Sequence, residues 1–231
     1  MTTQTDFGAP VPMIDMEVIV PDIMAEVSDC PVPVIERRLR EAAIEACERV
    51  NLVRWQATEI PTKTDRSFYD VPTPSTQLRV HSIIRCYLNE TPLRNIPLIE
   101  TDDNVYNQIN NAASGYFVPS RGQIQLTGTP SEASSPVTDD PRTVRGLDLF
   151  VTLKPSRECD SLPRILYDDY YNLLVSGTLA RLFEMNDALW TNETKSERRH
   201  QEFEHEIARA KQQIDRGFTT KPLKLRPRRF V

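Results

Sequence analysis

Residues 147–156 read LDLFVTLKPS, and residues 162–183 read LPRILYDDYYNLLVSGTLARLF. The first run is rich in aromatic and aliphatic residues and stops at a proline, which predicts a strand. The second run has proline at its start and apolar residues at three- and four-residue steps, which predicts a helix. A charged run from Glu193 to Arg216 with a narrow apolar stripe predicts another helix. The stretch 147–218 therefore indicates a strand that leads into a helical hairpin.

The first predicted helix of this hairpin contains a glycine. Gly177 costs about 1 kcal/mol relative to alanine inside a helix, and a close approach of the two helices would explain its presence. We expect the hairpin to be held by the following packing residues: Tyr170, Leu173, Gly177, Leu182, Trp190 and Phe203. The charged helix can be capped by Thr191, Asn192 or Thr194. Thr194 and Glu197 together fit a capping box.

Upstream of the hairpin the hydrophobic period changes. Residues 34–53 carry apolar side chains on one face at three- and four-residue steps, which predicts an amphipathic helix. Residues 60–156 hold short β-prone runs separated by proline and glycine, and a hairpin turn is expected at Arg121-Gly122. Residues 1–33 mix prolines, acids and scattered apolar residues without a lasting period, so we expect an extended arm there.

These elements predict an α+β fold: a three-helix bundle core with an inserted antiparallel β-rich lobe and extended N- and C-terminal arms. A chain of 231 residues is long enough for one domain that carries an inserted lobe. The expected parts are an extended N-terminal arm at 1–33, a helical domain at 34–59 and 157–217, a β-rich insertion at 60–156, and a basic C-terminal tail at 218–231.

The C-terminal tail reverses the sign of the charge. The whole chain has a net charge of −5, yet residues 221–231 contain only basic charged side chains. Pro222 and Pro227 keep this segment extended, which lowers the entropy lost when it docks. Its apolar residues can fill pockets on a partner while its cations pair with acids. The candidate binding residues are Lys221, Leu223, Lys224, Leu225, Arg226, Arg228, Arg229 and Phe230.

No arrangement of residues in the sequence indicates catalysis or metal binding. His200 and His205 lie five positions apart, whereas a zinc pair on one helix face is spaced by four. No glycine-rich phosphate loop and no G-x-S-x-G motif occurs. The 4 cysteines are widely spaced without a C-x-x-C pair, which is typical of reduced thiols in a protein folded in the cytoplasm. We therefore expect no enzyme activity, no metal and no cofactor.

A membrane partner is not expected either. No stretch of the sequence approaches the roughly 20 apolar residues that cross a bilayer.

The order of these features resembles a known family. An amphipathic helix ends near Trp55, a strand-rich insert follows, and a strand then runs into Leu153-Lys154-Pro155-Ser156. The further motifs are Leu162-Pro163, Tyr170, Ser176-Gly177-Thr178-Leu179, Trp190-Thr191-Asn192 and a charged helix with Phe203. This order is similar to that of the head-to-tail adaptor family of tailed bacteriophages, also called connector or tail tubular protein A-like proteins. The resemblance covers about residues 31–217.

The resemblance implies a structural protein of the virion. Such proteins form a ring, usually dodecameric, beneath the portal protein, extend the DNA channel and offer a platform for tail attachment. The implied partners are the portal, a tail-side neck or tail protein, other copies of the chain, and genomic DNA that passes through the lumen without sequence-specific binding. The implied location is the neck of the virion, after assembly in the host cytoplasm. In this family a C-terminal extension commonly grips the portal, and residues 221–231 take that place here.

Two other classes of protein remain open on the sequence alone. The chain could be another neck or tail component, such as a terminator or tube protein, although those are usually β-sandwiches or barrels without long helices. It could also be a nucleic-acid-binding module that uses the basic tail and stacks bases on Tyr167, Tyr170 and Tyr171. Helix packing is the simpler interpretation of these tyrosines, since Tyr167 and Tyr171 lie four residues apart on one helix face. A nucleic-acid-binding module would show an affinity that falls steeply with salt.

Overall fold

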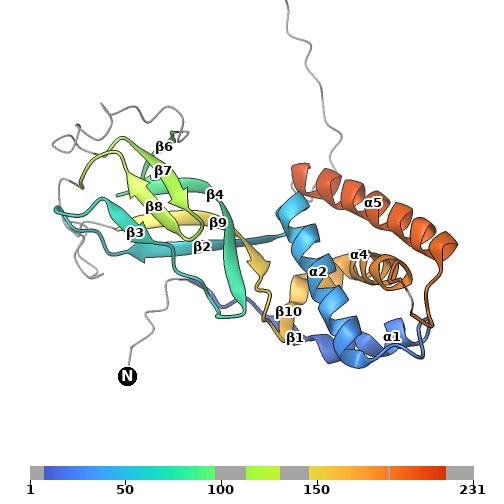
Figure 1. Ribbon diagram of the computed structural model, residues 1–231. Helices are drawn as coiled ribbons and strands as arrows, with labels where there is room; N and C mark the ends of the chain where they lie inside the picture. Colours follow the sequence, from blue (N-terminus) through green and yellow to red (C-terminus); the bar gives the residue numbers. More distant parts are fainter. Residues whose placement is uncertain (1–7, 97–112, 131–145, 187, 217–231) are drawn as a thin grey trace, which may run out of the picture.

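Figure 1 shows the computed structural model, which describes residues 8–96, 113–130, 146–186 and 188–216. The fold is mixed α and β, with the strands of two four-stranded sheets gathered in one lobe and the helices, beside the pair β1 and β10, in another. The helices are η1 (Met16–Val18, a 3-10 turn), α1 (Val20–Met24), α2 (Val32–Val50), α4 (Arg164–Phe183) and α5 (Glu193–Asp215). The strands are β1 (Met13–Asp15), β2 (Val53–Ile60), β3 (Phe68–Asp70), β4 (Leu78–Leu88), β5 (Thr91–Pro92), β6 (Arg94–Asn95), β7 (Gly115–Ser120), β8 (Gln123–Leu126), β9 (Leu147–Pro155) and β10 (Ser161–Pro163).

Strand β9 is the centre of the larger sheet, whose strand order is β2-β9-β4-β5. It pairs antiparallel with β2 on one side and with β4 on the other. Every second residue of β9 from Leu147 to Leu153 is fully buried, which is the alternation of a strand with one face in the core. The predicted strand at 147–153 is thus confirmed, and it extends to Pro155.

The smaller sheet has the order β3-β8-β7-β6. Its pairs are antiparallel except for β6 with β7, which is parallel. Tyr116, Ile124 and Leu126 belong to the same buried cluster as Leu149 of β9, so the two sheets share one core. The turn expected at Arg121-Gly122 is confirmed, since Ser120 pairs with Gln123 across it and Gly122 has a φ of 91°.

The helical lobe is built on α4. This helix packs against α5 and α2, and α1 lies beside it (Figure 1). The helix predicted at 34–53 is observed as α2, but it ends at Val50 because Asn51 adopts a left-handed conformation with a φ of 57°. Trp55 consequently belongs to β2 and not to the end of the helix.

The described part of residues 1–33 differs from the extended arm expected there. Residues 13–24 form β1, η1 and α1, and the buried apolar side chains of this part of the chain include Met16, Ile19, Val20, Ile23 and Val27. Their spacing of three, four, seven and eleven from Met16 is a helical period, which the prolines on either side obscure in the sequence. Pro21 is tolerated because it lies in the first turn of α1. This segment therefore belongs to the core of the helical lobe.

Polar contacts join the two lobes. Strand β1 pairs with β10, the short strand between β9 and α4 (Figure 1). Lys154 of β9 forms an ion pair with Glu48 of α2, in which the lysine Nζ donates a hydrogen bond to the carboxylate. This hydrogen bond holds the pKa of the Glu48 carboxyl below its ordinary value. Arg40 of α2 donates from Nε to the carbonyl oxygen of Cys159 at 2.8 Å. The lobes are thus connected by side chains as well as by the chain itself.

In the described parts of the chain, none of the helices combines the length and the apolar character that a membrane span requires.

Candidate functional site

Helices α2, α4 and α5 approach one another closely at Gly177. A Cβ atom placed on this glycine would lie 2.7 Å from two ring carbons of Phe203 on α5 and 3.1 Å from the Cβ of Ala42 on α2. Contacts below about 3 Å are not tolerated between carbon atoms that cannot move. Phe203 is 1% exposed, so its ring has little room to retreat. Three helices therefore meet at one glycine.

The structure places the other expected packing residues in or against the core. Leu173 and Leu182 of α4 are fully buried, and Tyr170 is buried at a kink where its φ and ψ are −126° and 29°. The Tyr170 hydroxyl has no hydrogen-bond partner among the described residues. Trp190 lies partly buried in the loop between α4 and α5.

A network of ion pairs surrounds the Gly177 contact. Arg181 of α4 donates to the Gly177 carbonyl oxygen at 2.6 Å, pairs with Glu45 of α2, and lies 5.2 Å from the centre of the Phe203 ring. The other carboxylate oxygen of Glu45 accepts a hydrogen bond from Arg49, which extends the network along α2. Arg181 therefore links α4 to both α2 and α5 beside the Gly177 contact.

Arg49 extends this network to the third helix. Its two terminal nitrogens donate to the two carboxylate oxygens of Glu204 on α5 at 2.5 and 2.6 Å. These hydrogen bonds hold the pKa of Glu204 below its ordinary value and raise the pKa of Arg49. The sequence shows the Glu45 and Arg49 pair as an i,i+4 spacing, but it contains no signal for the pairs that join different helices.

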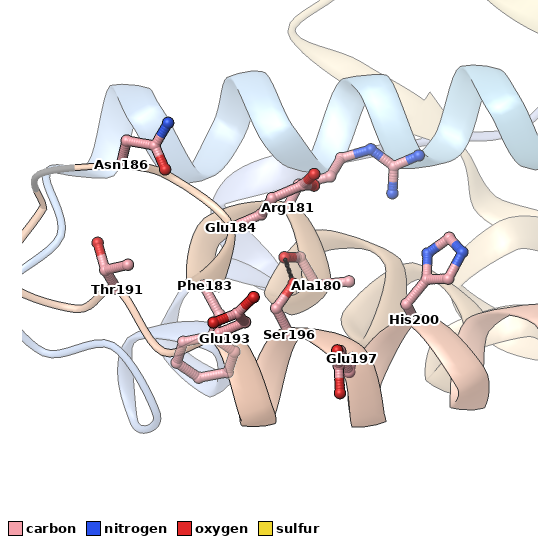
Figure 2. A pocket seen from close by; sticks show the side chains of 10 residues that line it. All are labelled: Ala180, Arg181, Phe183, Glu184, Asn186, Thr191, Glu193, Ser196, Glu197 and His200. Atoms are coloured by element: carbon pink, nitrogen blue, oxygen red, sulfur yellow. Dashed lines mark hydrogen bonds between the residues drawn. The ribbon is translucent and has the colours of Figure 1, made fainter.

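A second feature is the corner where α4 ends and α5 begins (Figure 2). Asn192 is the N-cap of α5, because its side-chain oxygen accepts from the Lys195 backbone N–H at 2.9 Å. Ser196 Oγ donates to the Ala180 carbonyl oxygen at 2.9 Å, which joins the two helices. An open groove of about 580 Å³ lies at this corner, and it is lined by Ala180, Arg181, Phe183, Glu184, Asn186, Thr191, Glu193, Ser196, Glu197 and His200.

A third feature lies on the exposed face of the larger sheet. A shallow groove of about 400 Å³, which we call the sheet groove, is lined by Arg54, Trp55, Gln56, Ile84, Arg85, Phe150 and Val151. Alternate residues of β2, including Arg54 and Gln56, are exposed, so this face of the sheet is open to solvent. The alternation of buried and exposed residues from Val53 to Ala57 follows apolar and polar residues in the sequence, which could have identified this face.

Among the described residues, no group of three or more His, Cys, Asp or Glu side chains is placed to hold a metal ion. The four cysteines are free and buried. Burial raises the pKa of Cys86 to about 12 and also raises the pKa of Cys47, so both thiols are protonated at neutral pH. The candidate tail residues between Lys221 and Phe230 lie outside the described residues.

Comparison with known proteins gives one family match. A search of curated proteins found no match to the chain. The family model described as SU10 adaptor protein matches residues 16–226, which includes every described helix and every described strand except β1. The resemblance to the head-to-tail adaptors of phages is thereby confirmed at the level of the family. The chain belongs to the SU10 adaptor protein family.

Proposed function

We propose that this protein is the head-to-tail adaptor of a tailed phage virion. It forms a dodecameric ring that docks beneath the portal. This ring extends the DNA channel and provides the platform to which the tail attaches. The observation that carries this proposal is the adaptor-family match over residues 16–226, which spans both lobes of the structure.

The helical lobe has the properties required of a ring wall. The contact of Gly177 with Phe203 fixes the distance between α4 and α5, and the Arg181, Glu45, Arg49 and Glu204 side chains join both helices to α2. Close packing and satisfied ion pairs make a helical unit stiff. A stiff unit can be repeated around a closed ring without changes in its internal geometry.

The charge of the chain is consistent with a channel through which DNA moves. Its net charge is −5 and its sequence pI is about 5.4, so the protein as a whole repels the phosphate backbone. Genomic DNA would therefore pass through the lumen without sequence-specific binding. The basic segment 218–231 is the exception, and we assign it to the portal, with its lysines and arginines paired to acids there and Leu223, Leu225 and Phe230 in pockets. A tail-side neck or tail protein would bind the opposite end of the ring.

Electron microscopy of the purified protein, alone and mixed with the portal protein of the same phage, tests this function. We expect closed rings seated on portal rings, with twelve subunits in class averages. Proteins that do not associate with the portal, or that assemble into open tubes, would contradict the proposal. A filter-binding assay with double-stranded DNA at increasing salt provides the control, because a nucleic-acid-binding module would bind tightly at low salt and release DNA steeply as salt rises.

A further inference from the structure

The sheet groove is shaped by an irregularity in β4. The register of β4 against β9 shifts between Val80 and Ser82 and again between Ile83 and Arg85. Such bulges break the alternation of a strand and redirect its side chains. As a result Ile84 and Arg85, although consecutive, are both exposed. An aliphatic side chain and a cation thus lie together at the groove.

The floor of the sheet groove is apolar and its rim is basic. Ile84 is 46% exposed, and the half-buried Phe150 packs edge-on against Tyr87 with ring centres 5.8 Å apart. Arg54 and Arg85 are exposed and form no ion pair with any residue that the structure describes. None of the described residues that line the groove is an acid. The groove is therefore suited to an apolar side chain flanked by carboxylates.

The loop between α4 and α5 offers that combination. We call residues 184–186 and 188–193 the hairpin tip. Leu189 at its end is 90% exposed, the most exposed of the large hydrophobic side chains in the described residues. Burial of such a leucine against another apolar surface is favourable. Glu184 precedes it by five residues and Glu193 follows it by four, and both are exposed and without an ion pair within the described residues.

Backbone hydrogen bonds tie described residues of the hairpin tip to one another and to α4. The Asn192 backbone N–H donates to the Phe183 carbonyl oxygen at 3.0 Å, and the Thr191 backbone N–H donates to that of Ala188 at 3.1 Å. A leucine presented by an ordered loop loses less conformational entropy on docking than one on a flexible chain. The two hydrogen bonds therefore reduce the entropy that Leu189 would lose on docking.

The hairpin tip of a molecule cannot reach the sheet groove of the same molecule. In Figure 1 the loop between α4 and α5 lies at the end of the helical lobe that is farthest from the strands, and the sheet lies at the opposite end of the molecule. Each surface is thus available to a different copy of the chain. A contact between two different patches of identical subunits propagates in one direction and closes into a ring when the rotation allows it.

We propose that the hairpin tip of one subunit docks into the sheet groove of the next, with Leu189 on Ile84 and Phe150 and with Glu184 and Glu193 facing Arg54 and Arg85. This inference rests on the proposed ring and names the residues through which neighbouring subunits recognise one another. The occupant of the groove is a second copy of this chain, because its hairpin tip matches the groove in both charge and apolar character.

Disulfide trapping between two single-cysteine variants tests the contact. Ile84→Cys and Leu189→Cys are mixed in equal amounts at high protein concentration under mild oxidation. The native cysteines are buried, so the introduced thiols should react selectively. We expect the mixed dimer to form several-fold more than with a control pair, Val118→Cys with Leu189→Cys, in which Val118 is 38% exposed on the other sheet. Equal yields for the two pairs would overturn the proposal.

A charge swap tests the polar part of the contact. Adding Arg85→Glu to the Ile84→Cys chain should lower the yield of mixed dimer several-fold, because it places two carboxylates together. Adding Glu184→Arg to the Leu189→Cys chain should restore it. Loss without recovery in the swapped pair would overturn the assignment of Glu184 to Arg85.

The trapping result and the ring test are independent. If rings form on the portal but the Ile84 and Leu189 variants do not cross-link above the control, this interface is wrong while the adaptor function stands. If the variants cross-link efficiently but the chains form open fibres that ignore the portal, the interface stands while the proposed function fails.

Discussion

Gly177 is the position at which the fit of the helical lobe can be tested most directly. Gly177→Leu should overpack the contact with Phe203 and Ala42 and reduce the free energy of unfolding by about 1–3 kcal/mol. A thermal or urea melt measures this loss. Asn172→Leu is the matched control, because Asn172 is exposed on the same helix and a leucine there meets no packed ring. An unchanged melting temperature for Gly177→Leu would show that Phe203 can move aside.

The ion pair of Arg49 with Glu204 makes the stability of the lobe depend on pH. The pKa of Glu204 is lower in the folded protein than its ordinary value because Arg49 donates hydrogen bonds to it. The pair therefore contributes its full stability at pH values above the ordinary glutamate pKa, and this contribution disappears as the pH falls through the lowered pKa. Glu204→Gln should thus be less stable than the wild type at neutral pH, and the difference should shrink in acid.

Urea unfolding of both proteins at a series of pH values from neutral down to about 3 checks this prediction. Glu158→Gln serves as the control, since Glu158 is exposed and forms no ion pair among the described residues. A stability difference for Glu204→Gln that stays constant across the series would mean that the pair is not formed in solution.

At the scale of the elements, sequence patterns located the long helices and the central strand well. The charged helix expected from Glu193 to Arg216 is α5, and the helix expected near Pro163 begins at Arg164. Their periods are long enough to stand out from the background. The N-terminal segment was missed because its helix, α1, has only 5 residues, and because it is stabilised by contacts with helices far along the chain.

The candidate site could be predicted only in part for a related reason. Gly177 and Phe203 are visible in the sequence as an unfavourable glycine and an apolar stripe. The sheet groove is not visible, because it depends on two register shifts in β4 that no local pattern specifies. The ion pairs between helices depend likewise on how the helices are rotated about their axes.

The sequence offers three candidates for the N-cap of α5, namely Thr191, Asn192 and Thr194, and in the structure the cap is Asn192. Asn192 has extended backbone angles and caps the helix, whereas Thr194 already lies inside it. Asn192→Ala should lower the free energy of unfolding by about 0.5–2 kcal/mol, which is the usual effect of losing an N-cap side chain. Thr194→Ala is the matched control and should leave the urea midpoint almost unchanged. The reverse order of effects would place the cap at Thr194.

The N-terminal segment offers a second test at this scale. Ile23 of α1 is fully buried, so Ile23→Ala should reduce the free energy of unfolding by about 2–5 kcal/mol. Val18, in the neighbouring 3-10 turn, is 48% exposed, and Val18→Ala should have little effect. Equal effects of the two substitutions in a urea melt would indicate that α1 is not docked on the lobe.

At the scale of the whole molecule, the proposed function divides the chain into a body that builds the ring and a tail that holds it to the portal. Deletion of residues 218–231 should leave the melting temperature of the subunit unchanged, because the described core ends with α5. The truncated protein should no longer sediment with portal rings. Co-sedimentation at the level of the full chain would contradict the assignment of the tail as the portal anchor.

The pairing of β1 with β10 has a consequence for the order of events during synthesis. Residues 13–15 leave the ribosome before the β-rich lobe, whereas their partners at 161–163 and helix α4 follow only after that lobe has been made. The hairpins β4–β5 and β7–β8 can form from local contacts alone, whereas α1 and α2 must wait with their apolar faces uncovered. We therefore expect the nascent chain to be most prone to aggregate just before α4 emerges, and the helical lobe to close only after that.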